Sequence, residues 1–172
     1  MPSVPVPAEI KGEFPQEWVM NNLYDVENPR KKGVTKEYAK MYDSRTLGAG
    51  VDVVSGHPEL YNKAKRFGIE KELADEIAYE HIVHDDQVIR DNYADIYGKA
   101  AADTLSFGPR FLVAQARYQQ GNVRKGWDEI HKALAKGDAK ALKKAVLKVT
   151  PEDHDYRKKW VKNFNVYGNE PE

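Results

Sequence analysis

The strongest constraint on the fold is a proline that ends a helix shortly before a glycine-rich hairpin. Trp18, Leu23 and Val26 recur at near-helical spacing in PQEWVMNNLYDVE, which predicts a helix with one apolar face. The residue before a proline avoids helical geometry, so this helix should end before Pro29. Glu27 is then the acid at its C-terminal end, where the helix dipole opposes a negative charge.

Residues 36–54 change to the two-residue alternation of β-strands. YAKMYD predicts one strand, Asp43-Ser44-Arg45 supplies a turn, and TLGAGVDVV predicts the return strand of a short antiparallel hairpin or small sheet. Gly48 and Gly50 indicate a bulge, a place where a ligand approaches the backbone, or plain turn geometry. This hairpin would carry carboxylates back toward Glu27.

The rest of the chain has helical periodicity. We expect a short helix over residues 58–67 and a long one over residues 70–97, with a kink or break at Asp85-Asp86. Four further segments predict helices: PRFLVAQARYQQG, VRKGWDEIHKALAKG, DAKALKKAVLKV and DYRKKWVKNF. Glycines close the first two, Asp138 is the expected cap of the third, and Asp153 or Asp155 that of the fourth.

Composition limits the classes of function. The chain has 172 residues, no cysteine and equal numbers of basic and acidic side chains, 27 of each, which excludes disulfides and thiolate metal sites. Residues 110–172 carry 14 basic and 8 acidic side chains, but solvated helix faces account for them and we expect no nucleic-acid partner. No apolar run approaches about 20 residues, so stable membrane insertion is not expected. The N-terminus lacks the pattern of a signal peptide.

The segment after Glu27 resembles the phage-type lysozymes of the T-even group, glycoside hydrolase family 24. In that family a helix-ending acid precedes a hairpin whose return strand reads Thr-Ile-Gly-Ile-Gly-His. Residues 46–51, Thr-Leu-Gly-Ala-Gly-Val, stand in the same relation to Glu27. KMYD, residues 40–43, is similar to the strand that ends in the family's catalytic Asp, and PRFLVAQARYQQGN and RKKWVKNFNVYG resemble its later helices.

The resemblance implies an α+β, mainly α, lysozyme-like fold. An N-terminal arm over residues 1–14 would precede a single domain over residues 15–172. The domain would have a small hairpin lobe at about residues 28–68 and a larger helical lobe at about residues 69–172 that includes the first helix. The long helix would join the two lobes.

The same resemblance implies a peptidoglycan hydrolase that cleaves the β-1,4 bond between N-acetylmuramic acid and N-acetylglucosamine. Glu27 would be the general acid, Asp43 or Asp52 the base, and Thr46 would hold the attacking water. We expect a monomer without cofactor or metal whose partner is bacterial peptidoglycan. It would be a phage endolysin, a virion lysin or a toxin, held in the host cytoplasm before lysis and acting on the cell wall.

Two departures from the family leave the base open. NPRKKGVT is inserted between Glu27 and Asp43, and the histidine that ends the hairpin motif is absent. Bacteriocin-type lysozymes place an essential Asp after the Thr, and Asp52 lies six residues after Thr46. The sequence therefore admits both Asp43 and Asp52.

Two other functions are compatible with the sequence. A catalytically silent glycan-binding or structural module could use the same fold. A helical metal-carboxylate protein could be centred on Glu80, His81 and His84, because His84 lies three residues after His81 and four after Glu80, which puts acid and imidazole groups on one helix face. A solvated helix face is the simpler interpretation of those three residues, and His57 before Pro58 fits a turn.

Overall fold

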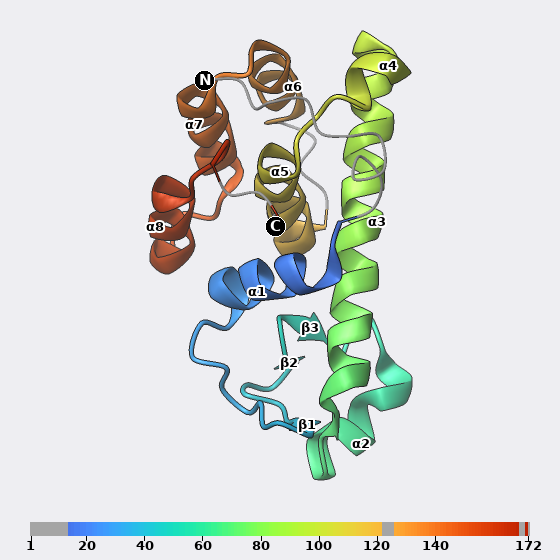
Figure 1. The fold of residues 1–172 in the computed structure, drawn as a ribbon. Helices are drawn as coiled ribbons and strands as arrows, with labels where there is room; N and C mark the ends of the chain where they lie inside the picture. The colour runs from blue at the N-terminus through green and yellow to red at the C-terminus, as the bar shows by residue number, and fades with distance from the viewer. Residues whose placement is uncertain (1–13, 122–125, 169–170, 172) are drawn as a thin grey trace. The chain divides into compact units, whose positions relative to one another are not determined.

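The computed structural model describes residues 14–121, 126–168 and 171 (Figure 1). The expected N-terminal arm, residues 1–14, therefore lies outside the described residues apart from Phe14. The Phe14 side chain is buried, with ring centroids 5.9 Å from Phe107 and 6.1 Å from Phe111. The chain divides into a hairpin unit, Gln16–His81, and a helical unit, Ile82–Glu172 together with the segment that ends at Pro15.

The first helix ends where the sequence predicts. Helix α1 (Gln16–Glu27) stops two residues before Pro29. Its apolar stripe is buried and consists of Val19, Met20, Leu23, Tyr24 and Val26. Burial of this stripe fixes which way the last turn of α1 faces within the hairpin unit.

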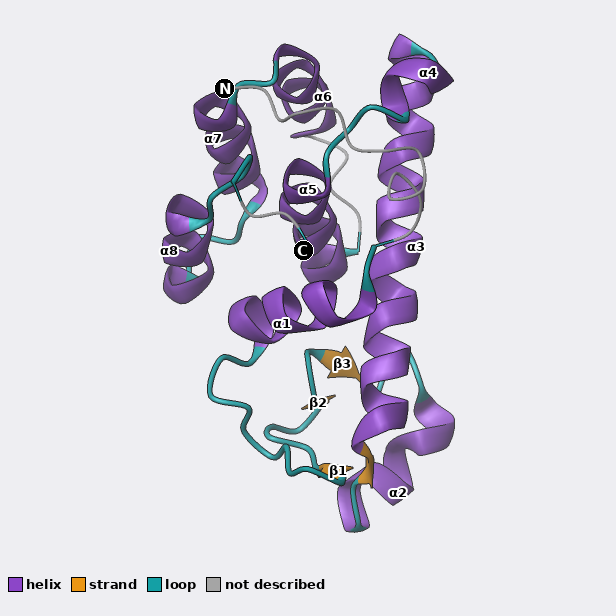
Figure 2. Ribbon diagram, viewed as in Figure 1, coloured by secondary structure: helices purple, strands orange, loops and turns teal. Residues whose placement is uncertain are grey.

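The strands of the hairpin unit are shorter and paired differently than the sequence predicts. Strand β1 (Tyr38–Ala39) pairs with β4 (Ile69–Glu70), and β2 (Thr46–Leu47) pairs with β3 (Val51–Asp52) (Figure 2). The expected hairpin between residues 38–43 and 46–54 is thus wrong as a single ladder, and only the isolated bridge Met41↔Leu47 joins those segments. Residues 46–54 instead form their own hairpin, with a turn at Gly48–Gly50.

The insertion NPRKKGVT explains part of this difference. Its backbone folds back on β1, because the Lys40 amide donates to the Gly33 carbonyl at 2.8 Å and the Thr35 amide donates to the Tyr38 carbonyl at 2.7 Å. A bridge Val34↔Ala39 lies between them. The insertion therefore takes hydrogen bonds that a longer hairpin would have used.

The helices follow the predicted segments closely. After the 3₁₀ turn η2 (Pro58–Leu60) come α2 (Tyr61–Arg66), α3 (Lys71–Tyr97), α4 (Lys99–Ala102), α5 (Phe107–Gln120), α6 (Trp127–Lys136), α7 (Ala139–Val149) and α8 (Asp155–Asn163). Helices make up 64% of the structure, so the fold is α+β and mainly α. Within the described ranges no helix is both long and apolar enough to cross a bilayer.

Most predicted helix ends are confirmed. Gly121 and Gly137 close α5 and α6 with positive φ, and Asp138 caps α7 by accepting a hydrogen bond from the Ala141 amide at 3.1 Å. The cap of α8 is different, because His154 precedes the helix and Asp155 is already its first residue. An acid in the first turn still complements the helix dipole.

The predicted kink at Asp85-Asp86 is wrong, and α3 is continuous. Both carboxylates have charged partners in the helical unit, since Asp85 is paired with Arg117 and Asp86 with Arg110. The pair Asp86–Arg110 is almost inaccessible, with exposed fractions of 0% and 1%. The helix can therefore continue through two adjacent acids, because arginines from α5 neutralise their charges.

The helical unit is organised around α7 and α5. Helix α7 contacts α5, α6 and α8, and ten consecutive residues of α5, from Phe107 to Ala116, are buried. Arg110 is among them, and it donates to both oxygens of Asp86, from Nε at 3.0 Å and from Nη2 at 2.5 Å. Its guanidinium lies 4.9 Å from the ring centroids of both Phe14 and Phe107.

Removal of Asp86 should strongly destabilise the protein. Asp86→Ala would leave the Arg110 charge buried without its bidentate partner, and loss of one member of such a pair costs about 3–5 kcal/mol. Arg90 Nε, 3.2 Å from Asp86 Oδ2 but outside hydrogen-bonding geometry, would lose its counter-ion as well. Urea denaturation followed by circular dichroism measures the change. The control Asp91→Ala, an exposed residue of the same helix, should stay within about 0.5 kcal/mol of the parent.

Candidate active site

Glu27 lies against the glycine-rich turn of the hairpin unit. Glu27 is half-buried at the end of α1. A methyl group placed on Gly50 would be 3.0 Å from Glu27 Oε2 and 3.1 Å from Glu27 Cδ and Cγ. Gly50 has φ of 89°, which a side chain disfavours. The turn therefore needs glycine at position 50 both for its backbone and to admit the Glu27 side chain.

Asn28 connects the end of α1 to the same turn. Its side chain is 3% exposed, and its Nδ2 donates to the carbonyls of Lys32 and Gly48, each at 3.0 Å. Its Oδ1 accepts from the Lys32 amide at 2.9 Å. A buried amide with its hydrogen bonds made is costly to move, so Asn28 sets the distance between the last turn of α1 and the hairpin.

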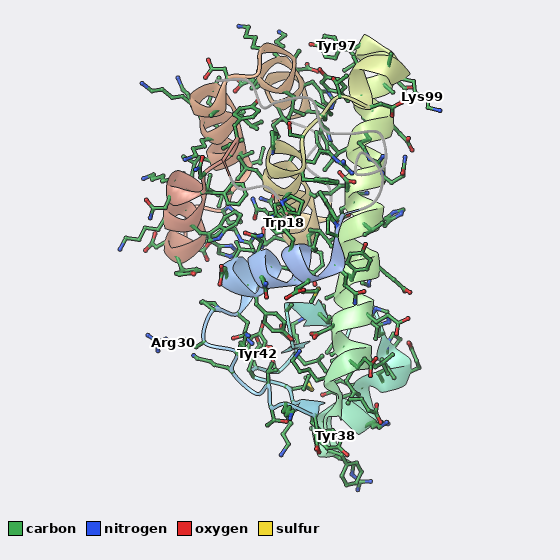
Figure 3. The ribbon with its side chains drawn as sticks, in the orientation of Figure 1. Trp18, Arg30, Tyr38, Tyr42, Tyr97 and Lys99 are labelled. Atoms are coloured by element: carbon green, nitrogen blue, oxygen red, sulfur yellow. The ribbon has the colours of Figure 1, made fainter. Side chains whose placement is uncertain are left out.

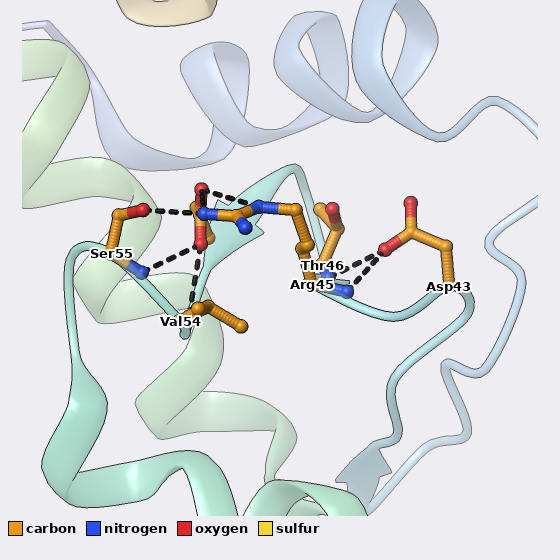
Figure 4. A network of polar contacts seen from close by, with 6 residues as sticks. Asp43, Arg45, Thr46, Val54 and Ser55 are labelled. Atoms are coloured by element: carbon orange, nitrogen blue, oxygen red, sulfur yellow. Dashed lines mark hydrogen bonds and ion pairs between the residues drawn. The ribbon is translucent and has the colours of Figure 1, made fainter.

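Asp43 and Thr46 are joined by a short polar turn. Asp43 Oδ1 accepts hydrogen bonds from the backbone amides of Arg45 at 2.8 Å and Thr46 at 2.7 Å (Figure 4). Such side-chain to backbone bonds are typical of Asp in turns. In Figure 4 the other oxygen of Asp43 and the hydroxyl of Thr46 point to the same side of the ribbon. Asp43 itself is exposed and Thr46 is half-buried.

Asp52 is held from several directions. Oδ1 accepts from the amides of Val54 at 2.9 Å and Ser55 at 3.0 Å, and Oδ2 accepts from the Arg45 guanidinium at 3.1 and 3.3 Å. Arg45 Nη2 also donates to the Ser55 hydroxyl. Desolvation raises the pKa of Asp52, but the hydrogen bonds from Ser55, Arg45 and Val54 and the Arg45 charge outweigh it and lower the pKa below its usual value. Asp52 is therefore ionised at neutral pH.

The hairpin and the turn before it bring Asp43, Thr46 and Asp52 together. Thr46 and Asp52 are directly paired across β2 and β3, and Asp43 is bonded to the Thr46 amide. Thr46 thus has one carboxylate in the preceding turn and another on the neighbouring strand. Glu27 joins this group through its contact with Gly50. One half-buried carboxyl group thus lies against the Gly48–Gly50 turn of a hairpin that carries Thr46 and Asp52, and Asp43 precedes that hairpin. Carboxyl and hydroxyl groups are the residue types that general acid-base chemistry uses.

A polar network lies next to Gly48 in the glycine-rich turn. The Tyr24 hydroxyl donates to Asp75 Oδ1 at 2.6 Å, and Lys71 Nζ lies 2.5 Å from Asp75 Oδ2. A methyl group on Gly48 would be 3.7 Å from the Tyr24 hydroxyl. Burial, the hydrogen bond to Asp75 and its charge raise the pKa of Tyr24 far above its usual value. The phenol is therefore neutral and can act as a fixed donor that joins α1 to α3 inside the hairpin unit.

Sequence reasoning missed Asn28 and Arg45. Asn28 directly precedes Pro29, and a polar residue at a helix end before proline is a turn signal that could have marked it. The sequence predicts only a turn at Arg45, which lies two residues after Asp43 and seven before Asp52. The sequence offered no signal that Arg45 would hold Asp52 and Ser55 together, because these contacts depend on the tight turn at Gly48–Gly50.

The alternative metal site centred on Glu80, His81 and His84 is not supported by the structure. No cluster of three or more His, Cys, Asp or Glu arranged to hold a metal occurs in residues 14–121, 126–168 and 171. His81 lies beside His57, with 2.8 Å between their Nε2 atoms.

The helical unit contains a pocket that sequence reasoning did not identify. Its volume is about 520 Å³. It is lined by Val88, Asn92, Asp95, Ile96, Arg117, Trp127, Asp128 and His131. The Trp127 ring stacks on His131 with centroids 5.5 Å apart. Desolvation lowers the pKa of His131 and the Asp128 charge acts in the opposite direction, so the imidazole is neutral. None of the residues predicted to form the site lines this pocket.

Comparison with known proteins adds no assignment. No family model matches the chain, and no curated protein or solved structure matches it significantly.

Replacement of Gly50 should reveal its packing against Glu27. Gly50→Ala and Gly98→Ala both place a side chain at positive φ, 89° and 92°, and each should lower the free energy of unfolding by roughly 1–3 kcal/mol. At Gly98 no atom of the described residues lies within 4 Å of the new methyl group. Gly50→Ala should lower the free energy of unfolding by about 1 kcal/mol more than Gly98→Ala, because the methyl group would crowd Glu27. Urea denaturation measures both values.

A second variant tests the cause of that difference. Glu27→Ala, introduced together with Gly50→Ala, should recover the additional loss because the crowded side chain is gone. Equal losses in the two glycine variants, or no recovery in the double variant, would mean that Glu27 does not pack on this turn.

Proposed function

We propose that this chain is a peptidoglycan hydrolase with a lysozyme-like fold. It would cleave the β-1,4 bond between N-acetylmuramic acid and N-acetylglucosamine. The observation that carries the proposal is the contact of Glu27, the last residue of α1, with Gly50 in the hairpin that also holds Thr46 and Asp52. The Thr-Leu-Gly-Ala-Gly segment that resembles the phage lysozymes forms this turn.

Glu27 would act as the general acid. It ends α1, where the carbonyl end of the helix dipole opposes a negative charge, and it is half-buried. Both conditions favour a protonated carboxyl group. Glu27 would give its proton to the glycosidic oxygen as the bond to the anomeric carbon breaks.

Asp43 suits the role of general base better than Asp52. The hydrogen bonds that Asp43 accepts from Arg45 and Thr46 both end on Oδ1. Its other oxygen points to the same side as the Thr46 hydroxyl, so the two groups could hold one water. Asp52 uses both oxygens for four hydrogen bonds and has a lowered pKa, which makes it a weaker base.

These roles account for both protons that move during hydrolysis. The base would take a proton from the water, the resulting hydroxide would add to the anomeric carbon, and Glu27 would protonate the leaving oxygen. Arg45 would hold Asp52 and Ser55 so that the hairpin keeps its shape. No cofactor takes part in this scheme. In the biological setting we propose a monomeric lytic enzyme, kept in the host cytoplasm until lysis, whose partner is the cell wall.

Loss of the acid should abolish lysis. Glu27→Gln keeps the side-chain shape but cannot deliver the proton, so turnover of purified peptidoglycan should fall by about 10²–10⁴-fold. Turbidity clearance and release of reducing sugar ends measure it. The control Glu17→Gln, an exposed acid in the first turn of the same helix, should keep the parent rate. If the parent protein binds peptidoglycan but never clears it, the chain is a silent glycan-binding module instead.

Substitution of Asp43 and substitution of Asp52 should change the hydrolysis rate by different amounts. Asp43→Asn should lower the rate about as much as Glu27→Gln, because the base is removed. Asp52→Asn would lose an exposed ion pair with Arg45, 3.1 Å in length, which contributes less than about 1 kcal/mol, and it should keep most of the activity. The same peptidoglycan assay compares them. The opposite order of rates would assign the base to Asp52.

A further inference from the structure

Two histidines outside the candidate active site meet at the surface of the hairpin unit. His57 precedes η2 and His81 lies on α3. Their Nε2 atoms are 2.8 Å apart and their ring planes are almost perpendicular, at 88°. His81 is exposed, and 22% of the His57 side chain is accessible. Two imidazole nitrogens therefore converge at a point that solvent ions can reach.

We propose that His57 and His81 bind a divalent transition-metal ion of the Ni²⁺ or Cu²⁺ type, with water as its other ligands. Imidazole nitrogen is a preferred ligand of these ions. With metal–nitrogen distances of about 2.0–2.1 Å, the 2.8 Å separation corresponds to an N–metal–N angle of about 86°. That angle matches neighbouring positions of a square-planar or octahedral ion. A tetrahedral ion would need the two nitrogens about 3.3 Å apart.

Ion binding requires only a small rearrangement of the rings. In the hydrogen-bonded pair one Nε2 carries a proton and the other accepts it. To bind one ion, both nitrogens must present lone pairs, and each lone pair must tilt about 45° from the line that joins them. The His57 backbone lies in a loop and the His81 side chain is exposed, so side-chain torsions can supply this tilt.

A neighbouring acid favours the required tautomer of His57 and the binding of a cation. Glu59 Oε1 lies 3.5 Å from His57 Nδ1. A carboxylate near Nδ1 favours a proton on that nitrogen and leaves Nε2 as the ligand, as in many metal sites.

The bound ion would join two parts of the hairpin unit. His57 follows the loop in which the amides of Val54 and Ser55 bind Asp52, whereas His81 belongs to α3. An ion bound to both would fix the end of this loop on the helix. The site does not depend on glycan cleavage, so it stands or fails separately from the proposed function.

Calorimetric titration with NiCl₂ tests the site in the full chain, purified without a histidine tag. The parent should bind one Ni²⁺, and His57→Ala and His81→Ala should each weaken binding at least about tenfold. His84→Ala and His154→Ala each remove another histidine and should bind like the parent. Circular dichroism of each variant checks that it is folded.

A thermal measurement provides a second readout. Ni²⁺ should raise the Tm of the parent and of His84→Ala, and EDTA should reverse the shift, because an ion that binds only the folded state stabilises it. His57→Ala should show no shift. The proposal is wrong if the parent fails to bind Ni²⁺, if His57→Ala binds as tightly as the parent, or if His84→Ala loses as much affinity as His81→Ala.

Discussion

The buried amide of Asn28 is the contact on which the candidate site depends. It satisfies the carbonyl of Gly48 in the hairpin and both backbone groups of Lys32 in the loop that follows α1. Because α1 ends at the preceding residue, any displacement of this amide would carry Glu27 with it. Glycine at position 50 then leaves room for the Glu27 side chain, because a Cβ there would lie only 3.0–3.1 Å from it. The Asn28 side chain and the absence of a side chain at Gly50 together place Glu27 beside the hairpin.

Asp43 and Asp52 are chemically similar groups in different environments. Asp43 shapes the turn with one oxygen, while Asp52 is held on both oxygens by Arg45 and by backbone amides. Arg45 therefore acts on the site through Asp52 and Ser55. A carboxylate that is fully used for structure is a poor proton acceptor, whereas one with a lone pair available toward a hydroxyl can bind and activate water.

The helices were predictable because their signals are local. Proline at position 29, glycines at positions 121 and 137 and Asp138 each act within one turn of chain. The strands were not, because a two-residue strand has little periodicity and its partner is chosen by tertiary contacts. Exposed aromatic side chains at element ends, such as Tyr38 and Tyr97 (Figure 3), likewise follow no pattern that the sequence reveals.

The sequence by itself determined where most helices begin and end, that Glu27 closes the first of them, and that glycines and acids follow it closely in the chain. Only the tertiary structure decided that β1 pairs with β4, that Asp85 and Asp86 are neutralised by arginines from α5, and that His57 meets His81. The physical reason is the separation along the chain over which each interaction acts. Capping, proline geometry and periodicity act over a few residues, whereas ion pairs, strand pairing and imidazole contacts join residues that are distant in the chain and exist only after the core has formed.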